Sequence, residues 1–173
     1  MRLLLDRMAS PIGTILLVSD GATLHALDFQ DYEERMHRLL RRQYGTYALT
    51  DGRVADGVRR GLEAYFEGDI AALDAIPVRT CGSAFQRLVW AALRDIPAGT
   101  TTTYGRLAAT IGMPTASRAV GLANGANPVA IVVPCHRVIG ADASLTGYGG
   151  GLPRKSWLLR HEAGAAAAGI RAA

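Results

Sequence analysis

A stretch without regular hydrophobic spacing, residues 69–80, divides the sequence into two halves of different character. The first half, residues 1–81, contains 10 arginines and 12 acidic residues, which gives it a net charge of −2. Residues 82–173 contain 9 basic and 3 acidic residues, a net charge of +6. A chain of 173 residues suffices for one domain or two small ones. We therefore expect one domain over residues 1–80 and a second over residues 81–173.

The first half has the pattern of a small α/β domain. A β-branched, apolar run over residues 14–18 precedes the turn signal Ser19-Asp20-Gly21, and residues 22–29 continue as a second strand. Together these segments predict a β-hairpin. Helical spacing predicts a helix that begins at Asp31, as its cap, and runs to about Gln43, and another over residues 54–66. We expect an antiparallel sheet accompanied by these helices.

The second half has the pattern of a mostly helical domain, so the predicted fold class is α+β. Ser83 can cap a helix that ends before the Pro97–Gly99 break. Thr103 can cap a short helix over residues 104–111, and Thr115 can cap another that runs to about Gly125. Two short helices joined by a tight, Gly-containing turn have the outline of a helix-turn-helix, which many helical hairpins share.

The predicted helix over residues 116–125 is built of small side chains, and Arg118 carries its only charge. Small residues permit close packing in a core. They equally suit a helix whose backbone lies against the minor groove of a duplex, which is about 6 Å wide. The positive charge of the second half is compatible with a phosphate-bearing partner, and 18 of the 19 basic residues are arginine, which binds phosphate well. Both interpretations of this helix stay open.

A chemically distinctive segment, Pro134-Cys135-His136-Arg137, directly follows an apolar, β-branched run. A cysteine reacts as its thiolate, so a reactive cysteine needs a base or a positive charge nearby. Neighbours in sequence often point in different directions, however, and cysteine is among the residue types most often buried. The residues alone therefore allow either a catalytic pair or a packed core cysteine.

From about Phe85 to Glu162 the sequence resembles the O6-alkylguanine-DNA alkyltransferases, also called methylated-DNA–protein-cysteine methyltransferases. The segment Pro134-Cys135-His136-Arg137-Val138 is highly specific for that family. Residues 1–80 match only in outline, as the family's variable N-terminal domain. The other matching segments, at compatible spacings, are Phe85-Gln86, Ile96-Pro97, Thr103-Tyr104, 117–121, Asn127-Pro128, Gly147-Tyr148, Lys155, 157–159 and Glu162.

The resemblance implies DNA repair by irreversible, stoichiometric transfer of an alkyl group from O6-alkylguanine to Cys135. It leaves open whether O4-alkylthymine is also a substrate. His136 would deprotonate the thiol through a water molecule, and Glu162 would orient the imidazole. Asn127 would hold the turn before the cysteine, and Tyr104 would help to rotate the nucleotide and protonate guanine N3. Two further residues, Pro134 and Arg137, would support the site structurally.

The resemblance also implies that the helix-turn-helix binds the minor groove and that Arg118 fills the gap left by a flipped base. The other expected DNA contacts are Thr103, Tyr104, Ala119, Gly121 and Ala123. The expected pocket residues are Tyr148, Gly149, Val138, Lys155 and Asn124. Taken singly, each of these residues also has an ordinary interpretation as a core, loop or surface residue.

Several positions depart from features of some relatives. Asn124, Ala130 and Gly149 stand where bulkier side chains can occur, which suggests a more open pocket that accepts alkyl groups larger than methyl.

The first half lacks the Cys/His set that forms a structural zinc site in some relatives. The Ala/Gly-rich tail from residue 163 to 173 is expected to be frayed. The remaining Cys and His residues are expected to serve packing or surface roles; they are Cys81, His25, His37 and His161.

The expected partner is double-stranded DNA containing O6-alkylguanine, with no metal and no cofactor. We expect a monomer, and cooperative binding along DNA stays open. Two cysteines, a short apolar start and no apolar run of about 18 residues predict a cytoplasmic protein without a membrane span.

The rival hypotheses are a lesion-binding protein without a reactive cysteine, a helix-turn-helix transcription factor and a cysteine hydrolase. The presence of Cys135 argues against a lesion-binding protein without a reactive cysteine. A transcription factor would need several base-reading side chains, and the recognition helix offers Arg118 and little else. A cysteine hydrolase would have to turn over, and therefore to release the bound group.

Overall fold

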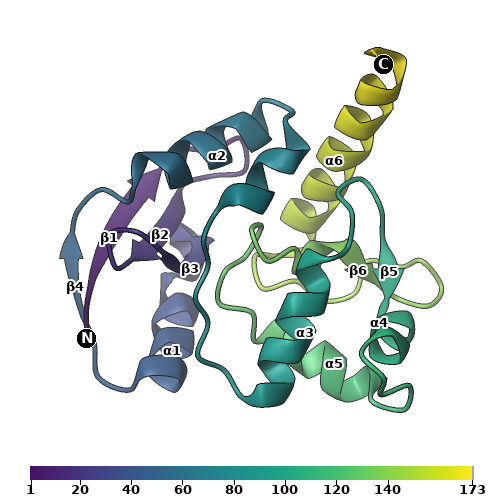
Figure 1. Ribbon diagram of the computed structural model, residues 1–173, viewed down its shortest axis with the longest axis horizontal. Helices are drawn as coiled ribbons and strands as arrows, with labels where there is room; N and C mark the ends of the chain where they lie inside the picture. Colours follow the sequence, from purple (N-terminus) through teal and green to yellow (C-terminus); the bar gives the residue numbers. More distant parts are fainter. Residues whose placement is uncertain (173) are drawn as a thin grey trace. The chain divides into compact units, whose positions relative to one another are not determined.

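The computed structural model describes residues 1–172, with side chains through Gly169. The chain divides into two compact units (Figure 1). The first contains Met1–Gly82 and Pro128–Val132, and the second contains Ser83–Asn127 and the residues from Val133 onward. The chain thus leaves the second unit for five residues immediately before the Cys-His segment, an excursion that the sequence analysis did not foresee.

The first unit is built on a four-stranded sheet with the strand order β3-β2-β1-β4. The predicted hairpin is confirmed: β2 (Ile15–Ser19) pairs antiparallel with β3 (Leu24–Phe29). β1 (Arg2–Met8) was missed by the sequence analysis and pairs antiparallel with β2. β4 (Ala48–Asp51) pairs in parallel with β1, so the sheet is antiparallel over three strands and gains one parallel edge strand.

The helices of the first unit lie close to the predicted ranges. α1 (Glu33–Tyr44) packs Met36 and Leu40 against Leu3, Leu16 and other buried side chains of the sheet. α2 (Asp56–Phe66) follows β4. Asp31 is not the cap of α1, because it lies inside a 3-10 turn, η1 (Gln30–Tyr32), and no side chain caps the helix. The expected linker contains a 3-10 helix, η2 (Ile70–Ala75), and a bridge between Leu24 and Val78.

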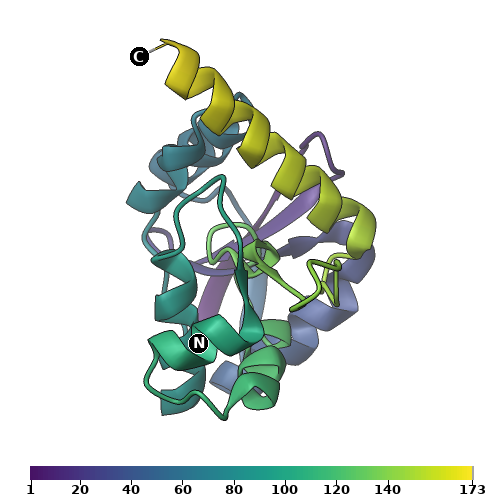
Figure 2. The same ribbon diagram turned by 90° about the vertical axis from the view of Figure 1, so that its right-hand side faces the viewer.

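The second unit consists mainly of helices, which confirms the α+β class. α3 (Ala84–Arg94), α4 (Tyr104–Thr110) and α5 (Ser117–Gly125) pack on one another, and α6 (Leu152–Ala172) is the long helix coloured yellow in both views (Figures 1 and 2). A two-stranded parallel sheet, β5 (Thr102–Thr103) and β6 (Val138–Ile139), joins the segment before α4 to the segment after the Cys-His pair.

The starts of these helices only partly follow the sequence expectation. Ser83 closes a capping box with Gln86, and the Thr103 hydroxyl accepts a hydrogen bond from the Arg106 amide, so both predicted caps are confirmed. The predicted cap at Thr115 is wrong, because α5 begins after Ala116 without a side-chain cap.

The tail expected to be frayed is helical through Ala172. It passes close to Gly99, where an added Cβ would lie 2.7 Å from the Ala166 side chain. The absence of a side chain at Gly99 thus makes room for α6. Within the described part of the chain, no helix is long and apolar enough to cross a membrane.

The capping box yields a stability prediction. Ser83→Ala removes the acceptor for the Gln86 amide and should lower the free energy of unfolding by about 1 kcal/mol. Urea unfolding followed by circular dichroism measures this loss. Thr115→Ala is the matched control, since Thr115 is exposed and caps no helix, and it should change the midpoint little. Equal losses in both variants would show that the Ser83 cap contributes nothing specific.

Candidate active site

Cys135 is the buried cysteine of the chain, and it begins the short 3-10 turn η3 (Cys135–Arg137). Pro134 stands at the N-cap of this turn, and the Cys135 amide donates to the Val133 carbonyl at 2.8 Å. Cys135 borders a pocket of about 260 Å³ in the second unit. The other residues that line this pocket are Tyr104, Gly121, Asn124, Gly125, Gly147, Tyr148 and Gly149.

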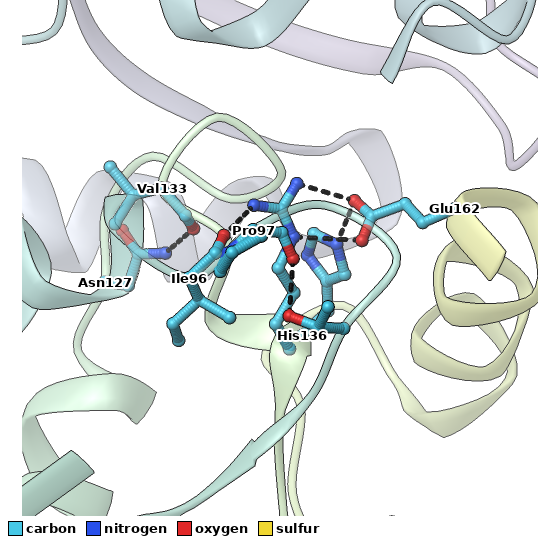
Figure 3. Close-up of polar contacts among 8 residues, drawn as sticks. Ile96, Pro97, Asn127, Val133, His136 and Glu162 are labelled. Carbon is cyan, nitrogen blue, oxygen red and sulfur yellow. Dashed lines mark hydrogen bonds and ion pairs between the residues drawn. The ribbon is translucent and has the colours of Figure 1, made fainter. Parts of the chain in front are cut away.

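The next residue, His136, is completely buried and pairs with a carboxylate from α6. Its Nε2 lies 2.7 Å from Oε1 of Glu162 (Figure 3). Its Nδ1 is buried and makes no hydrogen bond with the residues that the structure describes. The two residues are 26 positions apart, so only the tertiary fold brings them together.

Arg137 fixes the same carboxylate from the other side. Its Nε donates to Oε2 of Glu162 at 2.9 Å, its Nη2 donates to Oε1 at 2.9 Å, and its Nη1 donates to the Ile96 carbonyl at 2.7 Å. Such a two-pronged pair fits the geometry of guanidinium and carboxylate. Arg137 therefore holds Glu162 in position and keeps it ionised. This role is more specific than the structural support that the resemblance implied.

These contacts determine which groups are ionised. Burial would raise the pKa of Glu162, but hydrogen bonds from His136 and Arg137 outweigh it and lower that pKa below its usual range. Burial lowers the pKa of His136, although Glu162 opposes this effect, and the charges of Arg137 and Lys155 lower it further. Glu162 is thus a carboxylate and His136 is neutral. Nε2 carries the proton toward Glu162, which leaves the Nδ1 lone pair available as a base.

Asn127 braces the chain on the other side of the cysteine. Its Nδ2 donates to the Val133 carbonyl at 2.8 Å (Figure 3). Its backbone amide donates to the Asn124 carbonyl at 3.2 Å. Asn127 and Val133 are the residues at which the chain leaves and re-enters the second unit. Their bond therefore ties the end of α5 to the segment that carries Cys135.

Lys155 holds the loop that lines the pocket. Its buried ammonium on α6 donates to the carbonyls of Val138 at 2.6 Å, Thr146 at 2.7 Å and Gly147 at 3.4 Å. Three carbonyl acceptors match the three donors of an ammonium group. Burial lowers the pKa of Lys155, and the negative charge of a Cys135 thiolate opposes this shift. Tyr148 and Gly149, both expected as pocket residues, follow this anchored loop and line the pocket.

Three residues expected near the pocket do not line it; they are Lys155, Val138 and Ala130. Val138 is buried and contributes its carbonyl to Lys155 without being among the lining residues. Ala130 is buried in the segment that belongs to the first unit, where its amide donates to the Leu27 carbonyl. The expectation that Ala130 opens the pocket is therefore wrong. Conversely, the lining residues Gly125 and Gly147 were not predicted. The only signal in the sequence that could have indicated them is the presence of other glycines nearby.

The expected DNA-contact residues fall into two groups. Arg118 and Ala119 are exposed on α5, Gly121 is half-buried, and Arg118 forms no ion pair among the described residues. Thr103 is half-buried and occupied as the cap of α4. Ala123 is buried and its carbonyl accepts a hydrogen bond from Nε1 of Trp90 at 2.9 Å. The assignment of Ala123 as a DNA contact is therefore corrected, because it faces the core.

Tyr104 lies at the first position of α4 and lines the pocket. Its hydroxyl accepts a hydrogen bond from the Thr146 hydroxyl at 3.3 Å, which links α4 to the loop held by Lys155.

Among residues 1–172, no group of three or more His, Cys, Asp or Glu side chains is arranged to hold a metal ion. The chemistry available at this pocket is that of a buried thiol beside a neutral, oriented imidazole.

Comparison with known proteins covers both halves of the chain. Residues 84–164 match the family model described as 6-O-methylguanine DNA methyltransferase, DNA binding domain. Residues 4–80 match the model described as 6-O-methylguanine DNA methyltransferase, ribonuclease-like domain. The sequence is 48% identical over 165 residues to the methylated-DNA–protein-cysteine methyltransferase of Salmonella typhimurium, covering 94% of this chain and 96% of the relative.

Further relatives agree with this match. The methylated-DNA–protein-cysteine methyltransferase of Mycobacterium leprae is 46% identical over 155 residues, covering 90% of this chain and 89% of that protein. The crystal structure of Mycobacterium tuberculosis OGT in complex with DNA is similar at a TM-score of 0.78 and 41% identity, covering 94% of both chains. With both family models and nearly the full length of these relatives matched, the chain belongs to the methylated-DNA–protein-cysteine methyltransferase family.

Proposed function

We propose that this protein repairs DNA as a methylated-DNA–protein-cysteine methyltransferase that moves the alkyl group of O6-alkylguanine irreversibly onto Sγ of Cys135. The observation that carries the proposal is the arrangement at the pocket. A buried thiol borders a cavity of about 260 Å³, and the neighbouring imidazole is neutral and oriented by a carboxylate. A nucleophile, a base and an orienting group are the parts that nucleophilic catalysis requires.

The proposed reaction starts with removal of the thiol proton. That proton passes through a water molecule to Nδ1 of His136, and the resulting imidazolium is stabilised by Glu162. The thiolate then attacks the alkyl carbon, so that an S–C bond forms while the C–O6 bond breaks and its electron pair stays on the base. The departing guanine takes up a proton at N3 from the Tyr104 hydroxyl, and exchange with solvent returns the protons of Tyr104 and His136 to their starting state.

The base has to leave the duplex before this chemistry can occur. O6 of guanine lies inside the base stack, and extrusion of a nucleotide costs a few kcal/mol. We assign α4 and α5 as a helix-turn-helix whose α5 lies against the minor groove, because its exposed residues other than Arg118 and Leu122 are small and Arg118 projects from it without an ion-pair partner among the described residues. Arg118 would fill the space of the flipped base, and arginine–phosphate contacts would hold the duplex.

The proposed reaction is stoichiometric. A thioether has no good leaving group, and the pocket contains no second nucleophile among its described lining residues that could release the alkyl group from Cys135. Each protein molecule would therefore act once. Asn124 and Gly149 both line the pocket, as expected for a site that admits alkyl groups larger than methyl. O4-alkylthymine is a second candidate substrate of the same reaction.

The role of Arg118 predicts a difference between substrates. Arg118→Ala should slow the repair of O6-methylguanine in duplex DNA about tenfold or more, while its reaction with free O6-benzylguanine should stay near the wild-type rate. The free base needs no extrusion, so a side chain that replaces a flipped base has no role there. Single-turnover rates followed by intact-protein mass measure both reactions. Equal losses on the two substrates would contradict the assignment of Arg118 to base extrusion.

The relay of Cys135, His136 and Glu162 predicts a loss of rate without a loss of DNA binding. In Glu162→Gln the imidazolium loses its counter-charge, so alkyl transfer should slow by about 10²–10⁴-fold, the usual contribution of general base catalysis. DNA affinity, measured by fluorescence anisotropy, should change little. Circular dichroism controls for folding, because the substitution also weakens the bond to Arg137. A wild-type rate in this variant would rule out the relay.

The stoichiometry can be counted directly. Protein incubated with an excess of O6-methylguanine DNA should convert one lesion per molecule and gain one methyl group on the peptide that contains Cys135. Cys81→Ser is the matched control, since Cys81 is exposed and lies outside the pocket, and it should retain the full count. Cys135→Ser should convert none. More than one lesion converted per Cys135 would favour a cysteine hydrolase instead.

A further inference from the structure

The backbone of the segment before the nucleophile contains an unfavourable conformation. Ile131 has a φ of +69°, in the left-handed region that glycine adopts readily and that β-branched residues avoid. Its side chain is fully buried. The Val132 amide donates to the Ala130 carbonyl at 2.8 Å, so Ile131 is the central residue of a γ-turn with positive φ, which is the rare and strained kind. Residues under such strain cluster at functional sites.

Hydrogen bonds on either side of this turn explain why it is so tight. Before the turn the chain is tied to β3, because the Ala130 amide donates to the Leu27 carbonyl at 3.0 Å. After the turn the Val133 carbonyl is held by Nδ2 of Asn127 at 2.8 Å. Only residues 131 and 132 remain to turn the chain back between these two fixed points. A γ-turn, which reverses the chain within three residues, meets this demand.

The turn at Ile131 determines where the cysteine lies. The Val133 carbonyl also accepts a hydrogen bond from the Cys135 amide at 2.8 Å. Pro134 between them has a φ of −82° and a ψ of 64°, which makes a second γ-turn, of the common inverse kind. The chain from Ile131 to Cys135 thus passes through two tight turns, and a change of φ at Ile131 would move Val133 and the thiol together.

We propose that Ile131 is a positioning residue for alkyl transfer, whose buried side chain keeps the strained turn closed so that the Cys135 thiol stays within reach of the water that leads to Nδ1 of His136. The inference rests on the proposed transfer of the alkyl group to Cys135. Ile131 is not among the described residues that line the pocket, so it acts through the backbone and not on the substrate. A misplacement of about 1 Å can slow a reaction about 10²-fold.

The test compares Ile131→Ala with Ile131→Gly. Both substitutions remove the buried side chain, but only glycine adopts a positive φ without strain. In Ile131→Ala the turn should relax, and the reaction of Cys135 with free O6-benzylguanine, followed by intact-protein mass, should slow about 10²-fold. In Ile131→Gly the remaining hydrogen bonds suffice to keep the turn, so the rate should stay near the wild-type value. Loss of packing alone predicts the opposite order, because glycine removes more of the side chain and loses more conformational freedom on folding.

Two further variants separate positioning from stability. Ile131→Val removes one methyl group, is the substitution surest to fold, and should keep the wild-type rate because a buried β-branched side chain still holds the turn. Ile15→Ala is the matched control, since Ile15 is a fully buried isoleucine of the same unit, lies in the extended strand β2 and is not among the described lining residues. It should lower the midpoint of thermal unfolding as Ile131→Ala does, and leave the rate unchanged at temperatures where circular dichroism shows folded protein.

The possible outcomes separate this inference from the proposed function. Equal rates in Ile131→Ala and Ile131→Gly would overturn the inference while alkyl transfer to Cys135 stands. An Ile131→Val variant as slow as Ile131→Ala, or an equal loss of rate in folded Ile15→Ala, would also overturn it. A wild-type protein that transfers neither the benzyl group nor the methyl group of O6-methylguanine DNA would overturn the proposed function itself.

Discussion

The site depends on one buried carboxylate. Glu162 is fully buried, and a buried charge is tolerated only where charged and hydrogen-bonding partners compensate for the loss of water. Arg137 supplies the opposite charge through two of its nitrogens, and His136 supplies a further hydrogen bond. Because Arg137 also binds the Ile96 carbonyl, this network joins α6, η3 and the segment after α3. Removal of Arg137 would leave the buried carboxylate without its counter-charge, and the hydrogen bond to this fixed carboxylate in turn holds the imidazole of His136 in place.

The segment that carries the nucleophile has little regular structure of its own. Cys135 lies in a 3-10 turn of three residues, preceded by an excursion of the chain into the first unit. Its geometry is therefore set by side-chain bonds to the backbone on both sides. Asn127 ties the start of the segment through the Val133 carbonyl, and Lys155 ties the strand and loop that follow it. These bonds hold the thiol in a short turn that lies directly before strand β6.

The same unit combines two kinds of surface on α5. Its buried side contains Ala123, fixed by Trp90, and Asn124, which reaches the nucleophile's own carbonyl. Its exposed side contains Arg118, Leu122 and otherwise small residues. In the proposed function, the exposed side of α5 contacts the duplex, and its buried side lines the pocket that receives the base. Small residues satisfy both demands, because they allow close packing inside and close approach outside.

Local signals in the sequence correctly predicted the features that depend on neighbours along the chain. These were the β2–β3 hairpin from its Asp-Gly turn, the Ser83 and Thr103 caps, and the α+β class, while the Cys-His segment indicated the family. The sequence did not predict β1 and β4 or the burial of Ala123, and the pairing of His136 with Glu162 was expected only from the resemblance. Strand pairing, burial and contacts between residues 26 positions apart are decided by packing of distant segments, which has no signature in local periodicity. The sequence by itself thus determined which chemical groups are present and most of the local elements, and only the tertiary structure decided which groups meet, because burial fixes both their distances and their charges.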